Sequence, residues 1–332
     1  MDCLNFTSVR LHRVLAIAIL FLSFDVVLAD YSDHPQAQKF IDSMARNHQF
    51  DKVELTDIFA ATSRNEKVLE LIQRPAEKRL QWAEYRKIFL TEKRINAGVE
   101  FWLDNQETLK KAQLRYGVPA AMIVAIIGVE TYYGRISGGY SAISALSTLA
   151  FDYPRRSKFF TDELEQFLLL VKENSLDYQT LEGSYAGAFG YPQFISSSYR
   201  NYAIDFDEDG EVDLWNSVED AIGSVANYLY RHGWKSGQVV AEPASFKASG
   251  KSLVTDSPKP LHTYATMKKA GIYPKRKGNG KYTLLQLQAE QGAEYWIGHH
   301  NFYVITRYNH SNLYAMAVYQ LSQEIQSRKR GH

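Results

Sequence analysis

The segment from Ala120 to Tyr133 constrains the fold more than any other part of the sequence. Its residues are apolar on every side of the helix that their composition predicts, and Pro119, just before them, suits the first turn of a helix. A helix that is apolar all round is buried, so other elements must cover each of its faces. The sequence therefore predicts a protein packed around this segment.

One acidic side chain, Glu130, lies near the C-terminal end of this segment, and no other acidic or basic residue accompanies it there. Apolar surroundings and the negative end of a helix dipole both disfavour the charged form of a carboxyl group. A carboxyl group that keeps its proton near neutral pH is the kind that protonates a glycosidic oxygen. The structural alternative is a buried glutamate satisfied by an arginine or a tyrosine.

The rest of the chain is also mainly helical by pattern. Apolar residues recur at three- and four-residue steps before residue 115, and further helices are predicted over 158–172 and 221–230. Proline, glycine, lysine and short alternating runs, such as Tyr282–Gln288, indicate a small β-rich segment after residue 238, and Ser311 can cap a closing helix. The predicted fold is mainly α (α+β). The predicted division is an N-terminal helical region at 30–115, a core at 116–237, a β-rich segment at 238–306 and a closing helix and tail at 307–332.

The first 29 residues have the pattern of a secretory signal peptide. Arg10 and Arg13 precede an apolar run, and Val27 to Ala29 supply the small residues that a signal peptidase requires. The run is short for a membrane span, so we expect cleavage after Ala29 and a periplasmic protein without a stable membrane anchor; a retained anchor is the alternative. Cys3 precedes the apolar run, whereas the cysteine of a lipoprotein must follow it.

Charge and cysteine content exclude several classes of function. With 38 basic and 37 acidic residues, the formal net charge of +1 gives no global field for steering polyanions, so no nucleic-acid partner is expected. The basic residues at 328–330 are assigned to a solvated tail. Cys3 is the one cysteine of the chain, so the mature protein has neither disulfides nor thiol nucleophiles nor thiolate metal sites.

A glycosidase normally uses two carboxyl groups across its cleft, but here no second acid shares the signal of Glu130. The nearest candidate, Asp152, precedes Tyr153-Pro154 and is better explained as a capping or turn residue. A site with a single acid must obtain its nucleophile elsewhere, and an N-acetylated sugar can supply its own carbonyl oxygen.

Several motifs in order along the chain resemble one family. They are residues 126–134 (IIGVETYYG), 183–194 (GSYAGAFGYPQF), 214–215 (LW), 221–227 (AIGSVAN) and 301–309 (NFYVITRYN). Together they closely resemble the membrane-bound lytic murein transglycosylase B family and cover essentially the whole mature chain. Agreement of separate motifs is more specific than any single match.

The resemblance implies a lysozyme-like helical catalytic core, an additional helical domain and a small β-rich insert. It implies that Glu130 protonates the bond between N-acetylmuramic acid and N-acetylglucosamine in peptidoglycan glycan strands, then acts as a base while the muramoyl 6-hydroxyl closes a 1,6-anhydro ring. No cofactor is required for this chemistry. The substrate-binding residues that it implies are Ser184 and Gln193 around the acid, Tyr308, Asn309 and Tyr314 on the far wall, and Tyr85, Arg155 and Arg156 as further saccharide or peptide contacts.

The glycine-rich stretch around Ser184 and Gln193 has its own physical interpretation. Gly183, Gly187 and Gly190 would let a backbone approach a ligand closely, and the two polar side chains suit hydroxyl and amide groups. The alternative is a glycine-bent loop that packs on the core.

A second site is predicted in the acidic stretch from Asp205 to Asp213. Asp205, Asp207, Asp209 and Glu211 occupy positions one, three, five and seven of an EF-hand loop, with glycine at position six. Position twelve is Asn216, so the usual closing glutamate is missing. By resemblance, a later acid closes the loop, which leaves Glu219 and Asp220 as candidates. We expect a structural Ca²⁺, or alternatively Na⁺; an acidic turn without an ion is the other possibility.

Two other functions compete with the transglycosylase. A muramidase would hydrolyse the same bond with water on the same fold, and a non-catalytic protein would only bind peptidoglycan. The products of digestion distinguish a muramidase from a lytic transglycosylase. A complete set of Glu130, Ser184 and Gln193 argues against the second.

Overall fold

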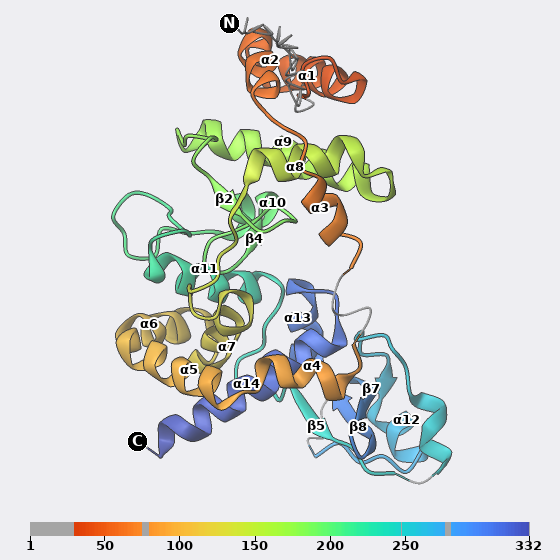
Figure 1. Cartoon of the computed structure of the whole chain (residues 1–332). Coiled ribbons are helices and arrows are strands. Elements are labelled where there is room, and N and C mark those ends of the chain that lie inside the picture. Colours follow the sequence, from red (N-terminus) through yellow and green to blue (C-terminus); the bar gives the residue numbers. More distant parts are fainter. Residues whose placement is uncertain (1–29, 75–79, 247, 276–279, 332) are drawn as a thin grey trace, which may run out of the picture.

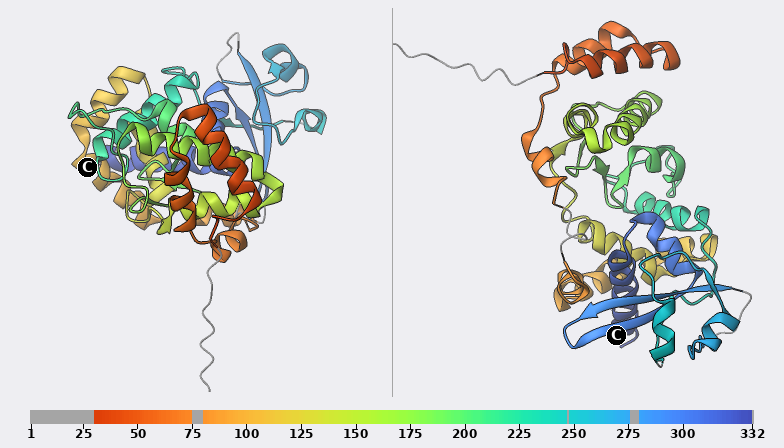
Figure 2. Two further views of the ribbon diagram at one scale, coloured as in Figure 1. Left: turned by 90° about the horizontal axis from the view of Figure 1, so that it is seen from above. Right: turned by 90° about the vertical axis from the view of Figure 1, so that its right-hand side faces the viewer.

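The computed structural model describes residues 30–74, 80–246, 248–275 and 280–331 (Figure 1). The predicted signal peptide lies outside these residues. The molecule is elongated and extends from helices α1 and α2 at one end, past stacked helices, to a helical block with a sheet beside it (Figures 1 and 2).

Helix α7 (Ala120–Thr131) is the buried helix that the sequence predicts. Residues 120–128 are all buried. It packs against α5 (Glu92–Asp104), α6 (Gln106–Tyr116), α11 (Val218–Arg231) and α14 (Asn312–Arg330). It ends at Thr131, two residues earlier than predicted, because Tyr132 and Tyr133 take left-handed conformations with φ of 52° and 63°.

Within the described part of the chain, no single helix is long and apolar enough to cross a membrane. By length and composition, α6 and α7 together would meet that test, but they form a pair bent by 114°.

A second helical group lies above this block and contains α8 (Ala142–Asp152), α9 (Ser157–Glu173) and α10 (Ser196–Tyr202). Helices α1 (Pro35–His48), α2 (Lys52–Ala60) and α3 (Glu66–Leu71) lie against this group. The ring of Phe151 in α8 packs 6.0 Å from that of Phe40 and 5.8 Å from that of Phe59. Asp152 accepts a hydrogen bond from the hydroxyl of Tyr31 at 2.7 Å, so it fastens the N-terminal segment to α8.

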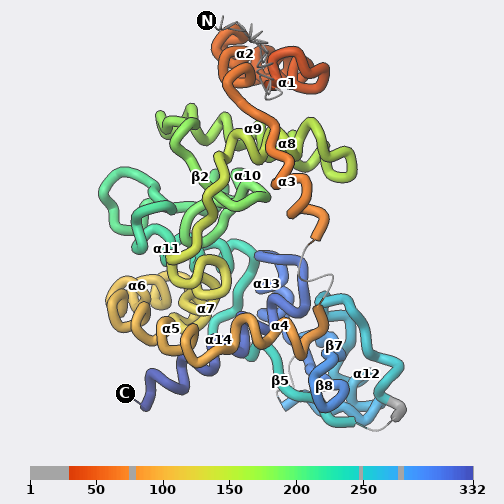
Figure 3. The backbone as a smooth tube through the Cα atoms, in the orientation of Figure 1, coloured from red at the N-terminus to blue at the C-terminus, as the bar shows by residue number. Residues whose placement is uncertain are grey.

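The predicted N-terminal helical region, 30–115, is not one unit. Helices α4 (Trp82–Phe89), α5 and α6 lie at the opposite end from α1–α3, where α4 and α5 pack against α14 (Figure 3). The prediction of a single region was wrong because helical periodicity shows which face of a helix is buried, not which element covers it.

The β-rich segment is a four-stranded antiparallel sheet in the order β5-β8-β7-β6. Its strands are β5 (Ala241–Pro243), β6 (His262–Thr263), β7 (Lys281–Ala289) and β8 (Gly292–Gly298), and helices η3 (Ala248–Leu253) and α12 (Tyr264–Lys269) flank it. A small separate core holds it together, made of Met267, Ile272, Tyr282, Leu284 and Ile297.

The sheet ends at Gly298, so the prediction that β structure extends to residue 306 was wrong. Residues His300–Tyr308 form helix α13, which buries Phe302, Val304 and Ile305 at helical spacing. The closing helix α14 follows, and Ser311 caps it by accepting a hydrogen bond from the Tyr314 N–H at 3.2 Å, as predicted.

Candidate active site

Glu130 lies half-buried in the last turn of α7, where the backbone turns sharply. Tyr132, Tyr133 and Gly134 all have positive φ. The ring of Tyr133 folds back so closely that a Cβ on Gly128 would lie 2.6 Å from it, and its hydroxyl donates to the carbonyl of Arg94 at 2.9 Å. The end of α7, and therefore the backbone of Glu130, is fixed by packing inside the core.

The glycine-rich stretch takes part in two short antiparallel strand pairs beside this helix end. Strand β1 (Tyr140–Ser141) pairs with β2 (Glu182–Gly183), and β3 (Ala188–Phe189) pairs with β4 (Phe194–Ile195). The hydroxyl of Thr131 donates to the carbonyl of Tyr191 at 3.0 Å and accepts from the Gly134 N–H. The residue after Glu130 thus connects α7 directly to this loop.

Glycines in this loop allow close approach to the protein's own atoms. A Cβ on Gly190 would lie 2.1 Å from the carbonyl oxygen of Leu214, and one on Gly187 would lie 2.5 Å from the side chain of Leu146. Gly187 and Gly190 therefore fit the alternative interpretation from the sequence, in which the loop packs on the core. Close packing within the protein explains why neither position carries a side chain.

Ser184 and Gln193 hold the loop in shape. The Ser184 hydroxyl oxygen accepts hydrogen bonds from the N–H groups of Ala186 and Ala188, at 3.3 and 3.1 Å. The Gln193 amide donates to the carbonyls of Ser137 and Gly190, each at 3.0 Å. Gln193 has a φ of 49°, which the two bonds of its side chain help to hold.

Tyrosines form the wall opposite the loop. The hydroxyl of Tyr314, from α14, donates to Glu130 Oε1 at 2.5 Å. Tyr308, at the end of α13, stacks on Tyr314 with ring centroids 6.4 Å apart and planes 12° from parallel. Burial, reinforced by the charge of Glu130, raises the pKa of Tyr308 and of Tyr314 well above 10, so both phenols remain protonated donors.

The contacts around Glu130 close into a ring. The hydroxyl of Tyr308 donates to the carbonyl of Pro192 at 2.6 Å, which fastens α13 to the glycine-rich loop. Thr131 fastens that loop to α7, and Tyr314 returns to Glu130. We use the name acid ring for Glu130, Thr131, Pro192, Tyr308 and Tyr314. Helices α7, α13 and α14 and the glycine-rich loop, which are far apart in sequence, therefore together fix the position of the Glu130 carboxyl group.

The remaining predicted contacts lie farther out. Tyr85, buried on α4, interacts electrostatically with Tyr314 and so lies on the tyrosine side of the acid. Arg155 and Arg156, in η2 (Pro154–Arg156), are exposed. The Arg156 guanidinium lies 4.1 Å from the ring centre of Phe159.

Arg156 nevertheless faces the segment that carries Asn309. Burial lowers the pKa of His310, and the positive charges of Arg307 and Arg156 lower it further, so Arg156 lies near the connection between α13 and α14. Asn309 ends α13 in an extended conformation. Arg156 and the segment that carries Asn309 therefore lie close together.

Sequence reasoning missed Thr131 and Tyr228. Thr131 was a polar residue within an apolar helix, and that signal could have identified it. Tyr228, in α11, packs its ring 4.7 Å from that of Tyr308 and donates to the carbonyl of Arg307 at 2.5 Å. Nothing in its local sequence distinguishes it from the other tyrosines of the chain.

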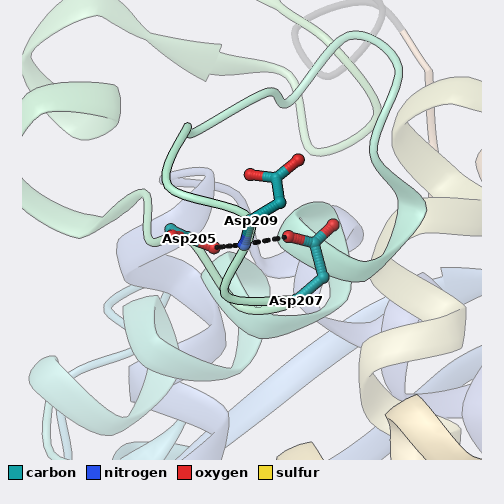
Figure 4. A group of neighbouring side chains, drawn as sticks. All are labelled: Asp205, Asp207 and Asp209. Atoms are coloured by element: carbon teal, nitrogen blue, oxygen red, sulfur yellow. Dashed lines mark hydrogen bonds between the residues drawn. The ribbon is translucent and has the colours of Figure 1, made fainter.

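The predicted ion loop brings three carboxylates together (Figure 4). Ligand atoms of Asp205, Asp207 and Asp209 lie within 4.8 Å of one another. Asp205 accepts hydrogen bonds from the N–H groups of Glu208, Asp209 and Gly210, and Lys111 anchors the loop to α6 by donating to the carbonyl of Phe206 at 2.9 Å. Like charges held this close repel, so the arrangement fits a hard cation with oxygen ligands.

The other predicted ligands are placed differently. Both oxygens of buried Asp220 accept backbone hydrogen bonds, from Phe206 at 2.6 Å and from Asp213 at 2.8 Å, so Asp220 joins the two ends of the loop. Burial raises the pKa of Asp220, and those N–H groups oppose the shift. Glu211 and Glu219 are not part of the carboxylate cluster.

Comparison with known proteins places the chain in a family. Residues 32–323 match the transglycosylase SLT domain. The membrane-bound lytic murein transglycosylase B of Escherichia coli (strain K12) is 43% identical over 307 residues, which are 89% of this chain and 84% of that protein.

Solved structures agree. The catenated lytic transglycosylase SltB1 from Pseudomonas aeruginosa matches with a TM-score of 0.86 at 46% identity, over 90% of this chain and 100% of that chain. The Escherichia coli lytic transglycosylase Slt35 in complex with calcium matches with a TM-score of 0.83 at 43% identity, over 91% of this chain and 96% of that chain.

The fold and these matches define the class of protein as a lysozyme-like, glycan-cleaving enzyme. More narrowly, the chain belongs to the transglycosylase SLT domain family. It is a peptidoglycan lytic transglycosylase, which cleaves the β-1,4 bond between N-acetylmuramic acid and N-acetylglucosamine without water.

Proposed function

We propose that Glu130 is the single acid and base of this reaction. The observation that carries the proposal is the hydrogen bond from Tyr314 to Glu130 Oε1 at the end of a buried helix. A phenol that stays protonated donates to one carboxyl oxygen and orients the group. The proton to be transferred is then carried by the other oxygen, Oε2.

The reaction proceeds in two proton transfers. Glu130 protonates the leaving glycosidic oxygen while the bond to the muramoyl anomeric carbon breaks. The acetamido oxygen of the same sugar stabilises the positive charge on that carbon. Glu130, now a carboxylate, accepts the proton of the 6-hydroxyl, whose oxygen bonds to the anomeric carbon and closes the 1,6-anhydro ring.

The other residues position the substrate. Ser184 and Gln193 form the loop wall, where their polar groups suit the acetamido and hydroxyl groups of the sugar. Tyr308 offers an aromatic ring that packs on a sugar face, and Tyr85, which is buried, acts on the substrate side only through Tyr314. Asn309 supplies an amide near the same wall, and Arg155 and Arg156 suit the carboxylates of a stem peptide.

The products of digestion test this mechanism. Internal attack by the 6-hydroxyl begins with a high effective molarity, so it outcompetes attack by water at the anomeric carbon. We expect muropeptides that end in 1,6-anhydro-N-acetylmuramic acid, each lighter by one water than the hydrolytic product and resistant to borohydride reduction. Mass spectrometry of digested peptidoglycan measures this. Spectra dominated by reducible muropeptides would instead identify the hydrolytic muramidase.

We also propose that the loop at 205–220 holds a structural calcium ion, with sodium as the alternative occupant. Asp205, Asp207 and Asp209 supply carboxylate oxygens, position seven, Glu211, supplies its carbonyl, and Glu219 or Asp220 closes the site. The proposal is supported by the carboxylate cluster and by the calcium complex of the related Slt35.

Calcium should therefore stabilise the protein. An ion that binds only the folded state at about 100 times its Kd adds about 2.7 kcal/mol to the free energy of unfolding, so the Tm should rise with calcium and fall with a chelator. In the double variant Asp207→Asn/Asp209→Asn, calcium should no longer raise the Tm, because the variant removes two negative charges although it keeps one oxygen on each side chain. Asp162→Asn, on α9, is the matched control. An unchanged Tm in the wild type, together with no metal in the purified protein, would disprove the site.

The cellular location that fits this function is the periplasm, where peptidoglycan lies. The predicted signal peptide at 1–29 supports it. N-terminal sequencing of the exported protein should begin at Asp30.

A further inference from the structure

The charge of the chain is strongly uneven. Between residues 245 and 281 the sequence contains nine lysines and arginines and one acid, Asp256. The formal charge of this segment is +8, and since the whole chain is +1, the rest carries −7. The near-neutral total therefore hides a basic part and an acidic part.

The described residues of this segment expose their cations. Lys251, Lys259, Lys268, Lys269, Lys275 and Lys281 are all exposed. None of the six forms an ion pair within the described part of the chain, in contrast to Lys87, which binds Glu290 at the far end of β7 and β8. We use the name basic lobe for residues 248–275 together with Lys281.

The basic lobe lies at the side of the molecule. It includes β6, the edge strand of the sheet, and α12, which lies beyond the strands and on the opposite side from α5 and α6 (Figure 1). Lys268 and Lys269 are in the last turn of α12, and Lys281 begins β7, opposite Thr263 of β6. These three lysines therefore lie around the outer edge of the sheet, whereas Lys275 lies nearer the other edge, where its N–H donates to Glu242 of β5 at 3.2 Å.

Large apolar side chains are exposed among these lysines. Leu261 is 52% exposed and Tyr273 is 63% exposed. Leu261 precedes β6 and donates its N–H to the carbonyl of Tyr282, while Tyr273 follows Ile272. Tyr282 and Ile272 both belong to the small core of the sheet. The backbone at Leu261 and at Tyr273 is therefore held in place by buried residues.

We propose that the basic lobe is a reversible docking surface for an anionic phospholipid bilayer. Lysines near such a surface each add to the attraction, and an exposed tyrosine and leucine can enter the interface between headgroups and acyl chains. A soluble polyanion would engage the charges but has no apolar layer for Leu261 and Tyr273. The acidic remainder of the molecule is repelled by the same surface, which orients the protein with the basic lobe toward the bilayer.

The position of the basic lobe gives this orientation a consequence for the enzyme. In sequence the sheet lies between α11 and α13. His299, which precedes α13, donates its N–H to the carbonyl of Val240 at 2.9 Å, and Tyr319 of α14 donates its hydroxyl to the carbonyl of Ala241 in β5 at 2.9 Å. Helix α13 carries Tyr308 of the acid ring. A protein docked through its basic lobe therefore holds the acid ring at a fixed angle to the membrane.

Vesicle sedimentation tests the proposal on the full mature chain, residues 30–332. The protein should bind vesicles of phosphatidylcholine with 30% phosphatidylglycerol, should not bind pure phosphatidylcholine, and should be released by about 0.5 M salt because screening shortens the range of the attraction. The quadruple variant K259Q/K268Q/K269Q/K275Q should bind at least about 100-fold more weakly. The matched control K67Q/K93Q/K110Q/K158Q changes the net charge equally and should bind as the wild type does.

A second variant separates a bilayer from a soluble polyanion. L261S/Y273S should weaken binding to the anionic vesicles and leave binding to heparin unchanged. All variants should keep the wild-type Tm and the wild-type turnover of soluble glycan fragments, which shows that they are folded. Three results would overturn the proposal. They are an equal loss of vesicle binding in the two quadruple variants, equal binding of the wild type to anionic and neutral vesicles, and wild-type binding to anionic vesicles by L261S/Y273S. Binding to isolated peptidoglycan but not to vesicles would overturn it in favour of a wall polymer.

Discussion

Replacing Glu130 by glutamine should leave a folded protein that has lost nearly all activity. Glutamine has the same volume and an oxygen that can still accept the Tyr314 hydrogen bond, so the ring of contacts around it can persist. It has no proton to give at neutral pH, and loss of general acid catalysis costs about 10²–10⁴-fold in rate. Turnover of purified peptidoglycan, followed by release of soluble muropeptides, measures the loss.

The control for this variant is Glu163→Gln. Glu163 is another buried glutamate, on α9, where it accepts hydrogen bonds from the N–H and hydroxyl of Ser197, and burial raises its pKa. Glutamine can replace those contacts, so activity should stay within about threefold of the wild type. Near-normal turnover by a well-folded Glu130→Gln protein would show that the acid is another residue.

Gly138→Ala should destabilise the protein strongly, whereas the same substitution at the adjacent Gly139 should have little effect. Gly138 has a φ of 101°, and a Cβ there would lie 2.2 Å from the carbonyl oxygen of Gly183. Gly138→Ala must therefore adopt a left-handed conformation and push the backbone before Ser184 away, at a cost of about 2–4 kcal/mol. A displacement of about 1 Å at the loop wall can reduce the rate by about 10²-fold.

Gly139→Ala is the matched variant. A Cβ at Gly139 meets no atom within 4 Å, and its φ is not positive. Its effect on the free energy of unfolding should stay within about 0.5 kcal/mol. Urea unfolding and peptidoglycan turnover of both variants make the comparison. If the two behave alike, the tight approach of Gly138 to Gly183 does not hold the loop.

The sequence revealed the helices with continuous apolar patterns most reliably. Helix α7 was predicted because its burial on all sides leaves no other interpretation, and α14 because Ser311 caps a regular apolar stripe. The polar N-terminal helices were also predicted, but not their division between two ends of the molecule. That division depends on partners such as Phe151 for Phe40, which are distant in sequence.

The candidate site was also only partly predictable from the sequence. Glu130 was predicted to be the acid from the apolar residues around it and from the family resemblance, but its contact with Tyr314 joins residues 184 positions apart and has no local signal. The uneven charge of the chain was visible in the sequence all along, yet the net charge of +1 concealed it. A local count of charges would have shown the basic segment.

The position of α14 also determines when the enzyme can become active. This last helix lies against α4, α5 and α7, and it carries the phenol that meets Glu130 (Figure 1). A chain that ends before residue 312 lacks both that phenol and the apolar surface that covers one side of α7. Synthesis must therefore be almost complete before the acid site can form, so an unfinished polypeptide has no means of cutting the wall.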